Sequence, residues 1–312
     1  MSQFVSQLSF IVVITVVTFF LGLKAVVTAQ VSQAVDAVFS GVFFYYSWKL
    51  MEEVPARRVL KEGQSLLTEG FVQVARTVRD INRSHKKGTR WFFLAVTCAE
   101  AGANAFTVVA VVFLAEELEF SSLEIGIFFI VSLVFSIPGS ILGTYVTRKL
   151  DPKRSWCLVM VLLFLWSSIG AVVLEFLPEH LSFLSFLWGS GIGLFLGWFY
   201  PVENLFFAMC LPKGQEAELS GFFVYCSQIL GWLPPLIFSI MVEAKVGQTY
   251  GVVAVSGFLL LSAGIISCAA PWPEILEDCG RGLKGTEVES ADDSLKQNEE
   301  MAPSENAPDE EL

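Results

Sequence analysis

Eight long apolar stretches constrain the fold of this chain more than any other feature of its sequence. A helix that crosses the hydrocarbon core of a bilayer needs about 20 mostly apolar residues. The stretches do not alternate between polar and apolar residues, and they are about twice as long as a strand of a membrane β-barrel. Because backbone in lipid must satisfy its own hydrogen bonds, they predict helices, and the chain is expected to be an all-α polytopic membrane protein. The predicted spans are residues 8–29, 34–51, 91–115, 123–147, 155–177, 181–209, 219–242 and 250–271.

The composition excludes several other classes of protein. Charged residues make up 16% of the chain, against about 25% in a soluble domain. Aromatic residues lie in apolar runs rather than among Lys and Arg, so no nucleic-acid partner is expected. Two histidines and six cysteines without a CxxC pair give no basis for a metal or cofactor site. The last residues, 273–312, are acidic and polar, and we expect them to form a disordered cytosolic tail.

Basic and acidic connectors alternate along the chain. Connector 52–90 and the stretch "GTYVTRKLDPKR" at 143–154 are rich in Lys and Arg, whereas the connectors that follow them, at 115–124 and 174–181, carry Glu and no Lys or Arg. Lys and Arg near the ends of spans stay on the cytoplasmic side of a membrane. We therefore expect the two basic connectors in the cytosol, and eight spans would place both termini there as well.

The basic connector 52–90 contains a periodic apolar stripe. Leu67, Phe71, Val74, Val78 and Ile81 recur at the spacing of one helical face. With basic residues on either side of the stripe, this pattern predicts an amphipathic helix along the cytoplasmic face of the membrane. The alternative is a solvated linker whose periodicity is accidental.

Several polar side chains fall inside the predicted spans, where a charge costs roughly 2.5–3.5 kcal/mol on insertion scales. Glu100 and Asn104 lie four residues apart and therefore share one face of the third span, which suggests a polar cavity. The alternative is a hydrogen bond that joins two helices, and Glu203 could instead be hydrated at the cytosolic end of its span. The candidates are Glu100, Asn104, Tyr200, Glu203, Asn204 and Gln228.

Small residues and prolines mark two further features of the spans. Gly189, Gly193 and Gly197 form a small-xxx-small ladder that allows another helix to approach closely. Pro234 and Pro235 are expected to break the hydrogen-bond ladder of the seventh span.

With these residues in place, the chain resembles the major facilitator superfamily, and within it the autophagy-related vacuolar effluxer family. The stretch 143–154 is similar to the connector signature of the superfamily, in which a Gly precedes an Asp-Arg pair and a later basic pair. Thr147 stands where that signature has its acid. The residues of this cytosolic connector motif are Gly143, Arg148, Lys149, Asp151, Lys153 and Arg154.

Two other stretches carry the resemblance. "FFLAVTCAEAGANAF" is similar to the aromatic-rich start of the family's seventh helix, with Glu100 and Gly102 in the roles of its acid and its glycine. "LPKGQEAELSGFFVYCSQILGWLPPL", followed by "VGQTYG", is similar to the family's run of Pro, Gly, Glu and Gly-aromatic residues. The positions that match in this run are Pro212, Gly214, Glu218, Gly221, Gly231 and Gly247.

The resemblance covers about 40–271 and implies the last eight helices of a twelve-helix transporter. Residues 1–51 would be two helices of an incomplete N-terminal half, 52–90 a linker, and 91–272 a complete C-terminal six-helix bundle. The implied function is export of small solutes, amino acids among them, from a vacuole-like internal membrane by alternating access. The polar candidates would line the pathway, and a proton is a candidate coupling ion.

Two other functions were weighed. A non-transporting remnant or regulatory subunit is compatible with an incomplete N-terminal half. An intramembrane enzyme would need paired acids or a Ser/His constellation near a membrane surface. The sequence by itself displays neither, so we expect no enzyme.

Overall fold

The computed structural model describes residues 25–51, 66–84, 87–176, 183–211 and 216–279. Within these ranges all the regular structure is helical, and six helical segments are long and apolar enough to cross a membrane. The prediction of an all-α polytopic membrane protein is confirmed. The segments are α4 (Thr89–Glu116), α5 (Ser122–Leu150), α6 (Pro152–Glu175), α7 (Leu184–Cys210), α8 (Glu216–Ile229) with α9 (Leu233–Glu243), and α10 (Gln248–Ser267).

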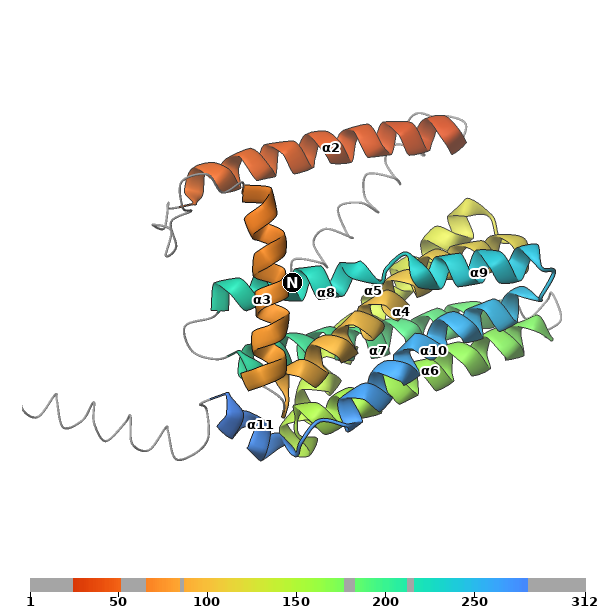
Figure 1. The fold of residues 1–312 in the computed structure, drawn as a ribbon. Helices are drawn as coiled ribbons and strands as arrows, with labels where there is room; N and C mark the ends of the chain where they lie inside the picture. The colour runs from red at the N-terminus through yellow and green to blue at the C-terminus, as the bar shows by residue number, and fades with distance from the viewer. Residues whose placement is uncertain (1–24, 52–65, 85–86, 177–182, 212–215, 280–312) are drawn as a thin grey trace, which may run out of the picture.

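These six segments form a bundle, and they match the last six predicted spans (Figure 1). α4 is the most buried of them, and it contacts α7, α8, α9 and α10. The apolar core has two parts. In one part the rings of Phe92 and Phe206 stack with centroids 4.8 Å apart. In the other, Trp188 packs against Phe113 and Phe128.

The closest helix pair is α5 with α7, and glycine makes the approach possible. A Cβ at Gly193 would overlap the carbonyl oxygen of Ser132, and a Cβ at Gly197 would overlap that of Ser136. From the other side, a Cβ at Gly139 would overlap the carbonyl oxygen of Leu194. The glycine ladder therefore lies at a contact between two backbones, as small residues do where membrane helices pack closely.

The basic stretch between α5 and α6 is helical rather than an extended connector. Asp151 alone separates the two helices, with a φ of 71° that L residues seldom adopt. Arg148 and Lys149 lie in the last turn of α5, while Lys153 and Arg154 follow Pro152 at the start of α6. The two helices therefore continue past the ends of the predicted spans at residues 147 and 155.

The seventh predicted span is interrupted. α8 ends at Ile229 and α9 begins at Leu233, so that Pro234 and Pro235 lie in the first turn of α9. A proline is tolerated in that first turn because its missing N–H would have no partner there. The interruption thus comes just before the two prolines.

The basic linker contains the helix α3 (Leu66–Ser84), which runs crosswise to α8 in Figure 1 and contacts α8 and α4. Ile81 is buried and Val74 is partly buried, as the stripe predicts. The side chain of Val78 is 48% exposed, and Thr77 beside it is buried. The helix meets the bundle along an edge of the stripe, so the stripe divides between a buried side and an exposed side.

The N-terminal part differs from the prediction of a connector at 30–33. The helix α2 (Ala25–Leu50) runs through these residues, which contain neither Gly nor Pro. α2 is not among the six segments that meet the criteria for a span, and large aromatic side chains such as Phe43 and Trp48 are exposed on it. The first predicted span falls mostly on residues 1–24, outside the described residues. The two N-terminal spans therefore stay predictions.

The prediction of a disordered tail from residue 273 is wrong for its first residues. Residues Trp272–Asp278 form the short helix α11, which buries Trp272 and Ile275 against the bundle. Ile275 fills the space beside Gly88, where a Cβ would overlap it. The prediction followed the acidic composition of residues 273–312 and overlooked the apolar pair Trp272 and Ile275. Residues 280–312 lie outside the described residues.

Candidate functional site

Two acids from different helices meet inside the bundle. Glu100 of α4 is 7% exposed and Glu203 of α7 is 2% exposed. Their carboxyl groups lie within hydrogen-bonding reach of each other. An ionised carboxylate only accepts hydrogen bonds. A hydrogen bond between these two groups therefore requires a proton held by one of them.

Two neutral polar side chains adjoin the acid pair. Asn104 donates a hydrogen bond from Nδ2 to Oε2 of Glu100 at 3.1 Å, and Asn104 itself lies on an exposed face of α4. Tyr200, one turn before Glu203 on α7, is partly buried and close enough to interact electrostatically with both acids. The pair is therefore connected to the surface of the bundle through the amide of Asn104.

One atom of the pair is left without a partner. Oε1 of Glu203 is buried and accepts no hydrogen bond among the residues that the structure describes. An unsatisfied buried polar atom costs roughly 1–3 kcal/mol. The site thus has capacity for one more donor, such as a hydroxyl, an ammonium group or a water molecule.

The local sequence explains how both acids are accommodated. Glu100 lies in the run Ala99–Ala105, where most side chains are small, and Gly102 is in contact with Phe258 and Leu259 of α10. Small residues on either side of an acid allow the neighbouring helices to surround it. On α8, Cys226 lies close to Thr97, one turn before Glu100, so α8 borders the same region.

Two predicted site residues are not part of this cluster. Asn204 is exposed, and its Nδ2 donates to the carbonyl oxygen of Tyr200 in its own helix at 2.9 Å. Gln228 is exposed on α8, and in the described part of the chain it makes no side-chain hydrogen bond with either acid. The structure thus brings together four of the six candidates: Glu100, Asn104, Tyr200 and Glu203.

The sequence alone does not predict that these two acids lie side by side. Glu100 and Glu203 are 103 residues apart in the sequence, and nothing local indicates which faces of α4 and α7 meet. The available signal was that each is an acid inside a span with no base nearby. Such residues seek a partner in lipid.

The connector motif forms a neutral hydrogen-bond network rather than an acidic one. The hydroxyl of Thr147 donates to the carbonyl oxygen of Gly143 at 2.6 Å and lies 2.7 Å from the hydroxyl of Ser155. Nε1 of Trp198 donates to the same Ser155 hydroxyl at 2.9 Å. Thr147, in the place of the acid of the signature, therefore joins α5, α6 and α7 without a charge.

The described ranges contain no group of three or more His, Cys, Asp or Glu residues that could hold a metal ion. The two acids of the cluster, an amide and a phenol are instead suited to binding protons and polar organic groups. Metal coordination would need further ligands that this cluster does not supply.

Comparisons with known proteins identify the family. The family described as "Vacuole effluxer Atg22 like" matches residues 1–270, which extends the resemblance from about residue 40 to the start of the chain. A search of curated proteins finds no match. The family is a transporter family of the major-facilitator-like group, and the six apolar segments agree with an integral multi-pass protein of an internal membrane. The chain belongs to the vacuole effluxer Atg22-like family.

Proposed function

We propose that this chain exports small organic solutes, with amino acids as the leading class, from a vacuole-like compartment by alternating access. In this proposal the acid pair Glu100–Glu203, with Asn104 and Tyr200, is the polar centre of the transport pathway. The observation that carries the proposal is the pair of buried acids from two helices, one of whose oxygens has no hydrogen-bond partner in the described part of the chain.

The chemistry of the pair suits a proton and a cationic group as alternative occupants. Two negative charges a few Å apart repel strongly where the effective dielectric constant is low. The pair therefore needs a positive charge or a proton between its oxygens. An ammonium group could replace the proton, while the amide of Asn104 and the phenol of Tyr200 would bind the uncharged polar parts of the solute.

Alternating access requires one bundle of helices to move against another around a site near the membrane midplane. Discontinuous helices are common beside such sites. The segment formed by α8 and α9 is such a discontinuous helix, interrupted between Ile229 and Leu233. It lies on the side of the bundle where Cys226 is close to Thr97. This feature supports transport, and it also explains why a double proline is tolerated.

The direct test is flux in proteoliposomes that contain the full chain. We expect Glu100→Gln and Glu203→Gln each to reduce uptake of labelled amino acids about tenfold or more. Each substitution removes one of the two carboxyl groups that would bind a proton or an ammonium group. We also expect the wild-type flux to depend on an imposed pH gradient. The control is Glu117→Gln, which neutralises an exposed acid at the end of α4. Wild-type flux in both pair variants would contradict the assignment of the site.

One observation favours a second function, that of a membrane-embedded interaction subunit. Phe43, Phe44 and Trp48 of α2 are all exposed by more than half, and in Figure 1 this helix lies apart from the bundle. A partner subunit could cover this aromatic surface. Measuring the mass of the purified complex in mild detergent separates the two functions, since a subunit should copurify with a second protein and show no flux.

A further inference from the structure

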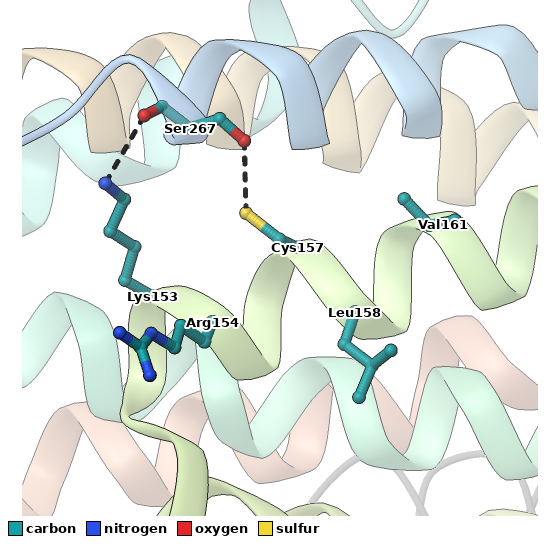
Figure 2. A pocket seen from close by; sticks show the side chains of 6 residues that line it. All are labelled: Lys153, Arg154, Cys157, Leu158, Val161 and Ser267. Carbon is teal, nitrogen blue, oxygen red and sulfur yellow. Dashed lines mark hydrogen bonds between the residues drawn. The ribbon is translucent and has the colours of Figure 1, made fainter.

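A groove lies between the start of α6 and the end of α10 (Figure 2). Its volume is about 480 Å³. All but one of its lining residues come from one face of α6, and Ser267 comes from the last turn of α10. The lining residues are Lys153, Arg154, Cys157, Leu158, Val161 and Ser267.

The lining changes from basic to apolar along the axis of α6. Arg154 is in the first turn of the helix, and Leu158 and Val161 follow at about 6 Å and about 10 Å further along the axis. Ser267 and Cys157, whose Oγ and Sγ atoms are 3.4 Å apart, lie between the two ends. This order of charge, weakly polar groups and hydrocarbon is the order found in a phospholipid.

The basic end of the groove carries charge that the fold does not neutralise. Lys153 donates from Nζ to the carbonyl oxygens of Ser267, Ala269 and Ala270, so it caps the end of α10 but keeps its positive charge. Arg154 is exposed, and within the described ranges it has neither a hydrogen bond nor an ion pair. Asp151 is the only acid among residues 143–158.

Lys153 stabilises the end of α10, but helix stability does not explain Arg154. A positive charge in the first turn of a helix opposes the helix dipole, which favours acids there. Arg148 and Lys149, by contrast, occupy the last turn of α5, where the dipole favours them. Arg154 in particular is therefore in a place that costs the helix free energy and that suits the binding of an anion.

We propose that this groove binds an anionic diacyl phospholipid from the leaflet that faces the basic connectors. Arg154 would donate to the phosphate or an acidic headgroup, while Lys153, whose three donors are used at the end of α10, would add only its positive charge. Ser267 would lie beside the glycerol esters, and an acyl chain would lie over Leu158 and Val161. Basic pockets between membrane helices at the cytoplasmic surface are suited to anionic headgroups. The lipid would fasten α6 to the end of α10, and this role is independent of the transported solute.

The apolar end of the groove distinguishes a lipid from a free phosphate compound. A small anion would use Arg154 alone and would gain nothing from Leu158 or Val161. A diacyl lipid of the same leaflet can place an acyl chain in van der Waals contact with these side chains. We therefore assign the groove to the intact lipid and not to its headgroup.

Native mass spectrometry of the purified full chain tests the proposal. We expect wild-type protein to retain phosphatidylserine in preference to phosphatidylcholine. Arg154→Gln should weaken phosphatidylserine binding about fivefold, the effect of one base near an anionic surface. The matched control is Arg148→Gln, which removes an exposed base outside the groove and should leave the retention unchanged. Equal losses in the two variants would mean general attraction to negative charge and would overturn the site.

Two further measurements complete the test. Val161→Ser leaves every charge in place and should also weaken phosphatidylserine binding, whereas a binding constant equal to wild type would exclude an acyl chain from the groove. Excess inorganic phosphate or glycerophosphoserine should fail to displace the lipid. Displacement by either compound would show that the groove binds the headgroup alone and would overturn the assignment. Thermal unfolding of each variant checks that it is folded.

Discussion

At the scale of single residues, Asn104 is the side chain through which the acid pair reaches an exposed face of α4. Asn104→Ala removes one hydrogen bond to Glu100, and a hydrogen bond to a charged group contributes roughly 1.5–3 kcal/mol. We expect flux in proteoliposomes to fall about tenfold while insertion into the membrane is unchanged.

The control for this variant is Thr107→Ala. Thr107 is also exposed on α4, and its hydroxyl donates only to the carbonyl oxygen of Ala103 in the same helix. If the two variants had the same flux, Asn104 would have no special connection to the pathway and the polar cluster would end at the two acids.

Ser155 is the residue on which the neutral network of α5, α6 and α7 depends. Its hydroxyl accepts from Nε1 of Trp198 and adjoins the hydroxyl of Thr147, and all three residues are buried. Ser155→Ala leaves the buried Nε1 of Trp198 without this partner, at a cost of roughly 1–3 kcal/mol, whereas Thr147 keeps its hydrogen bond to Gly143. We expect a clear fall in the thermal unfolding midpoint in detergent, measured by tryptophan fluorescence.

Ser239→Ala provides the comparison for Ser155→Ala. Ser239 is exposed on α9, and its hydroxyl donates to the carbonyl oxygen of Pro235 within the same helix. Its replacement should shift the midpoint little. A similar small shift for Ser155→Ala would mean that the network adds nothing to the contact between the three helices.

At the scale of elements, α5 and α7 approach each other so closely that their backbones are in contact. Gly193→Ala would place a methyl group on the carbonyl oxygen of Ser132, where no flexible side chain can move aside. Overpacking of this kind costs typically about 1–3 kcal/mol. We expect a lower unfolding midpoint and reduced expression of folded protein.

The same substitution at Gly264 of α10 is the matched control. A Cβ at Gly264 has no atom within 4 Å, so Gly264→Ala should be neutral or stabilising through better helix propensity. Gly193→Ala with the stability of Gly264→Ala would show that the two helices are further apart than the structure places them.

The amphipathic helix α3 illustrates what periodicity can and cannot specify about an element. Its stripe predicted the helix and the buried position of Ile81. It did not predict the exposure of Val78. Only one edge of the stripe contacts the bundle, and Val78 lies on the edge that does not. A stripe specifies which side chains avoid water but not whether protein or lipid covers them.

At the scale of the whole molecule, the basic turn at Asp151 and the acidic turn at Glu119 lie at opposite ends of α5. The distribution of Lys and Arg predicts that the first lies in the cytosol. In a chain whose native cysteines are replaced, Lys149→Cys should react with an impermeant thiol reagent only from the cytosolic side of sealed organelles. Glu119→Cys should react only from the other side, and the reverse pattern would invert the predicted orientation.

The sequence by itself determined that the helices of this chain lie in a lipid bilayer and that the protein is an all-α polytopic membrane protein. Apolar runs of about 20 residues have one stable structure in lipid, because only a helix satisfies its backbone there. The same local logic placed the helix breaks near Pro234 and the small residues of α7. Helix ends such as 148–154 and short apolar pairs such as Trp272 with Ile275 were predicted less well, since each depends on a few side chains.

The tertiary structure alone decided which faces meet. Glu100 was a single acid in the sequence and became half of a pair only when α7 packed against α4, while Gln228 remained exposed. Lys153 likewise became the cap of α10, more than a hundred residues away. Local spacing specifies the face of a helix on which a residue lies. The rotation and neighbours of that helix come from side-chain packing summed over the whole bundle, which no single stretch of sequence contains.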